Sequence, residues 1–162
     1  MRRKQNPNQT RRHRLKGHDY SAPGYYFVTF GTSNGADLLG TIEREEMRLS
    51  RIGQIVQSEI VALARAFDHL VVDAYAIMPN HLHLLIYLSI ENADTSVSSV
   101  VRHIKGRTAA AYRVLQGDAE TRGTLWHKGY HDEVVRDDRH LDAVRRYIFE
   151  NPLKWGNEDR WY

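Results

Sequence analysis

Two histidines on alternate residues of an apolar run are the side chains of this sequence best suited to hold a metal ion. His81 and His83 flank Leu82 in a strand-like stretch that continues through residues 84–86. Side chains alternate between the faces of a strand, so both imidazoles share one face while Leu82 points into the core. Two neutral imidazoles can bind a divalent cation, and without cysteine they form an open site that suits catalysis better than a structural zinc centre. The alternative is a pair of half-exposed histidines that bind nothing.

A tyrosine and an asparagine one helical turn apart form the second candidate group. Tyr147 and Asn151 lie in a helical pattern whose buried side is marked by Leu141, Val144 and Ile148. Residues four apart share a helix face, so the phenol and the amide oxygen can point the same way. Together with the histidine pair, they indicate metal-assisted phosphoryl transfer from a nucleic acid to a tyrosine. Taken alone, Tyr147 also fits an ordinary core residue, and an asparagine before proline is a common helix end.

Hydrophobic periodicity predicts the elements that position these groups. We expect strands at 25–30, 70–78, 81–90 and 125–135, and either a weak hairpin or an irregular segment at 38–49. We expect helices from Ser50 to about 67, from Thr95 or Ser96 to about 115, and from Asp137 or Asp138 to Asn151. The order predicts an α+β, ferredoxin-like βαββαβ antiparallel sheet with two helices on one face, plus an added C-terminal helix that carries the tyrosine. Pro152 disfavours helical geometry in the residue before it, so we expect this helix to end at Asn151.

The second of these helices is expected to be amphipathic. Its buried stripe is predicted to consist of Val97, Val101, Ile104, Thr108, Ala111 and Leu115. Arg102, Lys105 and Arg113 fall outside the stripe and are expected to face solvent. A solvated helix face and a track for phosphates are both compatible with these cations.

Composition limits the class of protein. The 162 residues are 41% hydrophobic and 27% charged, as in a globular protein of one domain. No apolar run approaches the roughly 20 residues of a membrane span, and no apolar segment follows the basic N-terminus as in a secretory signal. Because the chain has no cysteine, neither disulfides nor zinc–thiolate centres contribute. We therefore expect a cytoplasmic protein without a membrane partner.

Positive charge is concentrated at the N-terminus. Seven of the first sixteen residues are Lys or Arg and none is acidic, whereas the remainder holds 16 basic and 20 acidic residues. We expect residues 1–13 to form a flexible basic arm and residues 14–162 to form one catalytic domain. Such an arm can contact nucleic acid phosphates, or it can serve only solubility.

Four ordered segments resemble the motifs of one family. They are Arg14–Ser21 with Gly24–Thr29, Met78–His83, Leu125–Asp132 with Val135-Arg136, and Tyr147–Trp155. Together they span almost the whole chain and resemble the single-tyrosine transposases of the HUH endonuclease superfamily, in the branch of REP-associated tyrosine transposases. Asn151 and His127 stand where many relatives carry glutamine.

The resemblance implies a metal-dependent transposase that cleaves and joins single-stranded DNA near hairpins. It assigns Tyr147 as the nucleophile that forms a 5′-phosphotyrosine, and His81, His83 and Asn151 as ligands of Mg²⁺ or Mn²⁺. Transposon relatives form homodimers in which the tyrosine helix serves the partner's metal site, whereas some domesticated relatives are monomers. Both states remain open for this chain.

Cationic and aromatic side chains supply the candidate DNA contacts, because single strands expose phosphates and the faces of bases. We expect contacts from Arg12, Arg14, Lys16, Arg102, Lys105, Trp126, Tyr130 and Arg136. Two other functions remain open. One is a metal-dependent phosphodiesterase that uses water in place of Tyr147, and the other is a DNA-binding protein that no longer cleaves.

Overall fold

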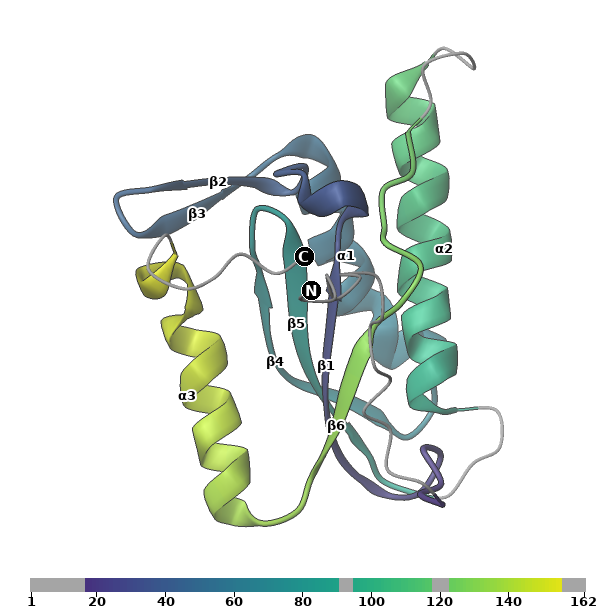
Figure 1. Ribbon diagram of the computed structural model, residues 1–162. Helices are drawn as coiled ribbons and strands as arrows, with labels where there is room; N and C mark the ends of the chain where they lie inside the picture. Colours follow the sequence, from purple (N-terminus) through teal and green to yellow (C-terminus); the bar gives the residue numbers. More distant parts are fainter. Residues whose placement is uncertain (1–16, 91–94, 118–122, 156–162) are drawn as a thin grey trace, which may run out of the picture.

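A four-stranded antiparallel sheet forms the centre of the protein (Figure 1). The computed structural model describes residues 17–90, 95–117 and 123–155. The strands are β1 (Gly24–Gly31), β4 (Leu70–Ile77), β5 (His81–Leu88) and β6 (His131–Val135), in the spatial order β4-β5-β1-β6. Helix α1 (Arg51–Ala66) precedes β4, and α2 (Val97–Gln116) lies between β5 and β6. This is the ferredoxin-like arrangement, so the predicted fold class is confirmed; the predicted basic arm, residues 1–13, lies outside the described residues.

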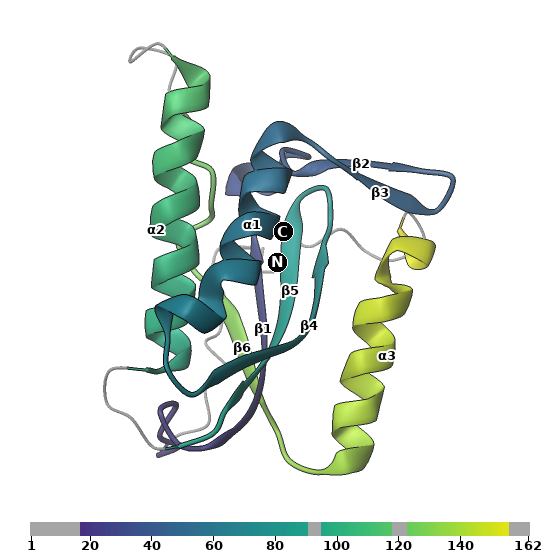
Figure 2. The same cartoon turned by 180° about the vertical axis from the view of Figure 1, so that it is seen from behind.

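The helices cover opposite faces of the sheet. On β5, Leu82 and Leu84 pack in one core with α1 and α2, whereas Leu85 packs in a second core with α3 (Asp138–Lys154). Figures 1 and 2 show α2 and α3 on either side of the sheet. Since His81 and His83 have the same parity as Leu85, the two-residue repeat of the strand turns both imidazoles toward α3.

An ion pair and two small residues hold α3 against β4. Arg145 donates from Nε and Nη2 to the two carboxylate oxygens of Asp73, at 2.8 and 2.6 Å. Asp73 lies at a bulge, where the pairing of β4 with β5 shifts between its two neighbours. The bulge changes which side chains face α3, and after it Ala74 and Ala76 pack in the α3 core. Their small size leaves room for the helix beside the sheet.

A separate two-stranded hairpin packs near the C-terminal end of α3. It consists of β2 (Gly40–Glu43) and β3 (Glu46–Leu49), follows a short 3-10 turn at Ser33–Gly35, and confirms the hairpin predicted at 38–49. Its two turn residues have φ angles of 51° and 65°, the left-handed backbone that a two-residue hairpin loop requires. Ile42 packs in the same cluster as Trp155, which follows α3 directly.

The predicted helix starts are confirmed. Ser50, Ser96 and Asp137 are the N-caps of α1, α2 and α3, and each side chain accepts a hydrogen bond from the backbone N–H three residues on. In α2 the Ser99 side chain bonds back to the Ser96 N–H and completes a capping box. No helix in the described part of the chain is long and apolar enough to cross a membrane.

The prediction that α3 ends at Asn151 is wrong. The helix continues through Pro152 to Lys154, and the N–H of Trp155 bonds to the Pro152 carbonyl. Pro152 has no N–H to bond to the carbonyl of Ile148, four residues earlier, so the helix continues with one backbone hydrogen bond fewer. Asn151 therefore lies inside the helix and is only 6% exposed.

The predicted strand at 125–135 is too long, because only His131–Val135 pairs as a strand. Trp126 turns into the core, where its Nε1 donates to Thr108 Oγ1 at 2.8 Å. The Lys105 ammonium donates to the carbonyls of His127 and Gly129 at 2.8 and 2.7 Å. Because the carbonyls of His127 and Gly129 accept hydrogen bonds from the Lys105 side chain, they do not extend the pairing of β6 with β1.

The prediction of which α2 residues are buried is partly wrong. Val97, Val101, Ile104 and Thr108 are buried as expected, but Val100 joins them and Leu115 is 38% exposed. Figure 1 shows the C-terminal end of α2 projecting beyond the sheet, which agrees with the exposure of Leu115. Lys105 is also not a solvent-facing cation, since its amine lies over the Phe30 ring, 5.1 Å from the centroid, and is partly buried.

Candidate active site

The turn between β4 and β5 orients the first histidine. Pro79-Asn80 forms this turn, which is closed by a bond from the Met78 N–H to the His81 carbonyl. Asn80 is fully buried; its amide nitrogen donates to the Gly35 carbonyl at 3.3 Å and its Oδ1 accepts from His81 Nδ1 at 2.7 Å. Because Oδ1 can only accept, His81 carries its hydrogen on Nδ1 and presents an Nε2 lone pair.

The second histidine is oriented by the neighbouring strand. Thr29 is the register partner of His83 across β1 and β5, and its Oγ1 lies 2.8 Å from His83 Nδ1. Phe27, two residues before Thr29 and thus on the same face, stacks against His83 with ring centroids 5.5 Å apart. The Nδ1 nitrogen and one ring face of His83 are therefore held by the protein.

The two imidazoles converge on one point. His81 Nε2 and His83 Nε2 are 3.1 Å apart. Two nitrogens about 2.1 Å from one cation and at roughly a right angle to each other would be about 3 Å apart, so the spacing suits ligands of a common metal ion.

Two proton arrangements satisfy this chain of groups. In one, His83 donates from Nε2 to His81 Nε2 while the Thr29 hydroxyl donates to Nδ1. In the other, His83 donates from Nδ1 to the Thr29 oxygen, and both Nε2 lone pairs are directed at the same point. A hydroxyl that can donate or accept lets the pair change between them without changing charge.

Burial keeps both histidines neutral. It lowers the pKa of His81 to about 4, and burial together with the neighbouring His81 lowers the pKa of His83 to about 3. The side chains are 5% and 1% exposed. Neutral imidazole is the form that binds metals, so both nitrogens are available as ligands at neutral pH.

These shifts predict an acid-sensitive fold. Below pH 6.5 the unfolded chain protonates both histidines while the folded chain does not, so the free energy of unfolding falls as pH falls, until the folded pKa values near 4 and 3 are reached. Between pH 7 and pH 5, we expect this term to cost about 2–4 kcal/mol in metal-free buffer. Urea unfolding at both pH values measures it. His83→Gln should lose distinctly less stability than the wild type over this interval, and equal losses would contradict the assignment.

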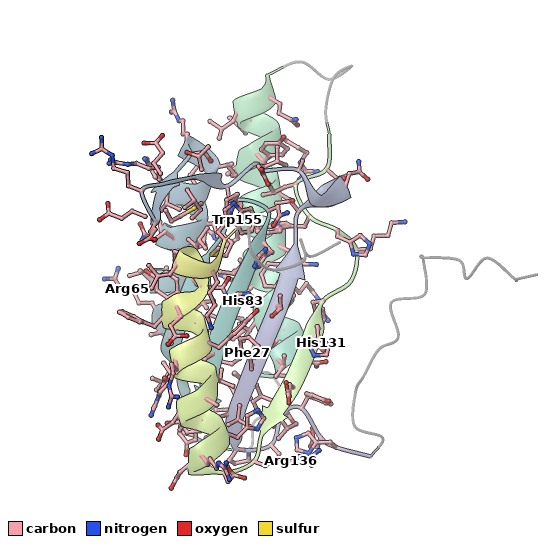
Figure 3. All side chains as sticks on the ribbon, turned by 60° about the vertical axis from the view of Figure 1, so that its left-hand side comes forward. Phe27, Arg65, His83, His131, Arg136 and Trp155 are labelled. Atoms are coloured by element: carbon pink, nitrogen blue, oxygen red, sulfur yellow. The ribbon has the colours of Figure 1, made fainter. Side chains whose placement is uncertain are left out.

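One face of α3 lies against the histidine pair. The Tyr147 ring packs edge-on to His83 with centroids 5.2 Å apart, and the Trp155 ring lies over His81 with centroids 5.9 Å apart. Asn151 is midway between them at spacings of four, so it belongs to the same helix face. Figure 3 shows His83 behind α3, with Trp155 at the C-terminal end of that helix. The predicted residues Tyr147, Asn151, His81 and His83 are thus brought together within one chain.

Asn151 supplies an unpartnered polar group. It is buried, and its amide nitrogen has no hydrogen-bond partner among the described residues. An amide can turn by 180°, so this position can equally present oxygen, the atom that Mg²⁺ and Mn²⁺ prefer. No group of three or more His, Cys, Asp or Glu in the described ranges could hold a metal ion. A metal bound by the two imidazoles therefore needs a different third donor, and the amide fits.

The nucleophile candidate has a ring fixed by its neighbours. Tyr147 is half-buried, and its ring is held edge-on by Phe27, with centroids 6.0 Å apart, and by His83. Within the described residues, no hydrogen bond ties up its hydroxyl. A fixed ring with an uncommitted oxygen is what an attack on an incoming phosphate requires.

Sequence reasoning missed the residues that orient the site. Asn80 has a weak signal, since it directly precedes His81, but Thr29 and Phe27 become recognisable only once the register of β1 on β5 is known. Trp155 belongs to the segment Tyr147–Trp155, but its residue type gives no sign that it packs on His81. These positions depend on tertiary pairing, which residue types alone do not reveal.

The candidate DNA contacts fall into three groups. Arg102, Lys105, Trp126 and Tyr130 line one pocket beside α2. Arg136 is exposed in the turn before α3, at the far end of that helix from Trp155 (Figure 3). The remaining three lie outside the described residues: Arg12, Arg14 and Lys16.

Comparisons with known proteins agree with this geometry. Residues 38–151 match the family described as "Transposase IS200 like", a range that includes both histidines, Tyr147 and Asn151. An uncharacterised protein of Haemophilus influenzae is 26% identical over 92% of this chain and 91% of its own length.

Two solved structures share the fold. A REP-associated tyrosine transposase bound to a REP hairpin has a TM-score of 0.63 and 20% identity, over 86% of this chain and 72% of that one. A candidate transposase from Deinococcus radiodurans has a TM-score of 0.51 and 20% identity, over 86% of this chain and 98% of that one.

Proposed function

Because the chain belongs to the IS200-like transposases, enzymes that cleave and join DNA, we propose that it cuts single-stranded DNA by attack of Tyr147 on a phosphodiester. The Tyr147 oxygen forms a bond to phosphorus while the bond from phosphorus to the 3′ oxygen breaks. One proton leaves the phenol and one is taken up by the departing 3′ oxygen. The products are a 5′-phosphotyrosine and a free 3′-hydroxyl, and the covalent bond retains the energy needed to rejoin the strand.

We propose that His81, His83 and Asn151 hold a divalent cation, Mg²⁺ or Mn²⁺. Such an ion, when bound, neutralises the charge of the phosphodiester and stabilises the transition state. The neutral imidazoles with converging nitrogens and the buried, unpartnered amide support this ligand set. Asn80 and Thr29 act on the ligands, since they orient the rings and set which nitrogen carries hydrogen.

The observation that carries the proposal is the shared face of α3. Tyr147 and Asn151 lie on the side of that helix that packs against the histidine pair of the same chain. The proposed reaction therefore needs no residue from a second copy, although it does not exclude a homodimer. Water in place of Tyr147 would leave the fixed phenol beside the metal ligands without a role.

We propose that the substrate is single-stranded DNA beside a hairpin, which is the substrate implied by the resemblance to the REP-associated branch. One protein of the same fold is bound to a REP hairpin. The basic segment that contains Arg12, Arg14 and Lys16 adds positive charge for phosphates.

The test is a covalent trapping assay. Labelled oligonucleotides taken from hairpin repeats that flank the gene are incubated with the protein and Mn²⁺, then separated under denaturing conditions. We expect an SDS-resistant protein–DNA adduct that EDTA abolishes. Cleavage without an adduct would favour hydrolysis by water, and binding without cleavage across many hairpins would favour a DNA-binding protein that no longer cuts.

Thr29 offers a prediction about the metal ligands. Thr29→Val removes the hydroxyl that His83 Nδ1 needs, so the tautomer that presents Nε2 is left with a buried, unsatisfied N–H. We expect Mn²⁺ affinity to fall by about 10–100-fold, measured by calorimetry without DNA. Thr29→Ser keeps the hydroxyl and should bind Mn²⁺ nearly as well as the wild type. Equal affinity for the valine and serine variants would remove Thr29 from the site.

A further inference from the structure

The bulge at Asp73 gives α3 an anchor on the face of the sheet that carries the histidine pair. Before the bulge Val72 packs with α1 and α2, and after it Ala74 and Ala76 pack with α3. Without the extra residue, the two-residue alternation of β4 would turn Tyr75 toward α3 in place of an alanine. The bulge therefore presents a carboxylate and two small side chains to α3, and bulges beside active sites commonly redirect side chains in this way.

The contact between Asp73 and Arg145 restricts orientation as well as distance. Nε and Nη2 of the guanidinium donate to the two carboxylate oxygens at 2.8 and 2.6 Å, and the Asp73 side chain is only 16% exposed. Two parallel bonds between planar groups hold their relative angle, which a single exposed ion pair does not. The guanidinium also lies 5.9 Å from the centroid of the Tyr25 ring on β1. Two strands of the sheet therefore hold Arg145.

The remaining contacts of α3 with the sheet are less directional. Val144 and Ile148 are buried against the sheet, but apolar contacts have no preferred angle and resist separation more than rotation. On β4 the helix meets Ala74, which offers no large side chain to interlock with it. A second ionic contact, from His140 to Glu133 at 3.5 Å, is longer and requires a protonated histidine. The rotation of α3 about its own axis thus depends most on the pair of Asp73 and Arg145.

This rotation decides where the nucleophile candidate lies. Arg145 and Tyr147 are two residues apart on one helix and project about 160° apart, so a rotation of α3 moves both. An atom roughly 6 Å from the helix axis moves by about 1 Å when the helix rotates by about 10°. A misplacement of about 1 Å is enough to slow a reaction by about 100-fold. A small change at the anchor would therefore reach the phenol as a large loss of rate.

We propose that Asp73 and Arg145 are positioning residues for DNA cleavage, because their ion pair sets the rotation of α3 that brings the Tyr147 hydroxyl to a phosphate beside the histidine pair. This rests on the proposed function, in which Tyr147 is the nucleophile. The pair acts through Tyr147 and does not touch the reacting atoms. Its loss should consequently lower the rate of cleavage and leave the affinity for DNA unchanged.

The first test separates rate from affinity. Asp73→Asn keeps the shape of the side chain but removes its charge and one of the two acceptors, and Arg145→Gln breaks the pair from the other side. We expect each variant to form the adduct about 10–100-fold more slowly in single turnover at saturating DNA and Mn²⁺. Affinity, measured by anisotropy in the Tyr147→Phe background, should stay within about twofold. The double variant should be within roughly threefold of the slower single variant, since either change already breaks the pair.

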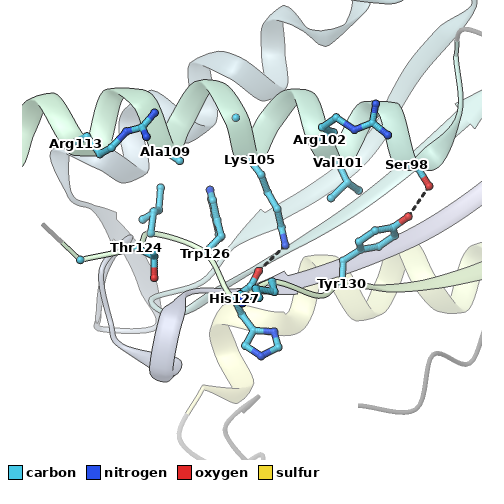
Figure 4. A pocket seen from close by; sticks show the side chains of 14 residues that line it. Ser98, Val101, Arg102, Lys105, Ala109, Arg113, Thr124, Trp126, His127 and Tyr130 are labelled. Atoms are coloured by element: carbon cyan, nitrogen blue, oxygen red, sulfur yellow. Dashed lines mark hydrogen bonds between the residues drawn. The ribbon is translucent and has the colours of Figure 1, made fainter. Parts of the chain in front are cut away.

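The matched control is a second ion pair of the same kind. Arg107 Nε donates to the Glu59 carboxylate at 2.7 Å, and the Glu59 side chain is 17% exposed. Arg107 lies on α2, the helix that forms one wall of the pocket in Figure 4 and packs on the opposite face of the sheet from α3. Glu59→Gln should therefore form the adduct at the wild-type rate. Urea unfolding verifies that every variant is folded under the assay conditions.

Three results would overturn the proposal. One is a wild-type rate in both Asp73→Asn and Arg145→Gln. Another is an equal slowing in Glu59→Gln, which would assign the effect to a general loss of stability. The third is a loss of DNA affinity as large as the loss of rate, which would mean that the two residues bind DNA.

A second readout does not depend on the chemistry. The Tyr147 ring packs edge-on to His83, so it shifts the NMR signal of the His83 ring protons, and Tyr147→Leu defines the size of this shift. In protein with ¹³C-labelled histidine, Asp73→Asn should move the His83 signal toward its position in Tyr147→Leu, and Glu59→Gln should not. An unmoved signal in Asp73→Asn would overturn the positioning role. Absence of an adduct in the wild type would overturn the proposed function alone, and this measurement would still decide whether the pair positions Tyr147.

Discussion

Tyr147→Phe is expected to abolish the covalent protein–DNA adduct while DNA affinity stays within about twofold. The substitution deletes one oxygen and retains the ring that packs against Phe27 and His83. Without the hydroxyl no bond to phosphorus can form, so the loss should reach the detection limit of the gel. Binding is measured by anisotropy with the same oligonucleotide.

The matched control is Tyr25→Phe. Tyr25 belongs to β1, lies on the sheet face that packs against α3, and loses the same single oxygen. We expect this variant to form the adduct at close to the wild-type rate. Persistence of the adduct in Tyr147→Phe would assign the nucleophile to another tyrosine, and its loss in both variants would point to a general defect of this face.

His83→Ala is expected to slow adduct formation by about a thousandfold, since it removes one imidazole of the proposed metal site. His83 is buried between Thr29, Phe27 and His81, so the alanine variant leaves the proposed metal site one ligand short. No other His, Cys, Asp or Glu among the described residues completes a group of three that could take over from the lost imidazole. Single-turnover rates at saturating Mn²⁺ measure the effect. Mn²⁺ calorimetry without DNA gives an independent readout.

His103→Ala serves as the control for His83→Ala. His103 is a partly buried histidine of α2 that lies 3.9 Å from Glu59, away from the site. It should retain wild-type Mn²⁺ affinity. Mixing His83→Ala protein with Tyr147→Phe protein is expected not to restore the adduct, because one chain brings the tyrosine to its own histidines. Restoration would mean that the tyrosine helix acts on a partner, and wild-type rates in His83→Ala would remove the metal assignment.

The fold and the central residues of the site follow from local patterns. Alternation along β5 was enough to predict that His81 and His83 share a face, and helical spacing was enough to pair Tyr147 with Asn151. The family predicted from the motifs is confirmed by the match over residues 38–151. The shared face of the two histidines and the pairing of Tyr147 with Asn151 each depend on a few consecutive residues.

What sequence reasoning did not predict depends on contacts between distant segments. Thr29 reaches His83 only through the register of two strands that are 54 positions apart. Lys105 fits a solvent-facing pattern on α2, but the carbonyls of 127 and 129 capture its amine. The sequence predicts that Pro152 ends α3, but the helix continues to Lys154, with Asn151 buried and Trp155 packed in the cluster on the α3 side of the sheet. Local propensity does not report such tertiary contacts.

Mass spectrometry of the trapped adduct tests the central claim most directly. Trypsin cleaves after Arg146 and Lys154, so Tyr147 lies alone among the nine tyrosines in the peptide 147–154. After nuclease digestion of the DNA, we expect that peptide to carry a nucleotide through a phosphate on Tyr147, only in the presence of the metal. A nucleotide on a peptide that contains a different tyrosine, or cleaved DNA with unmodified 147–154, would contradict the account.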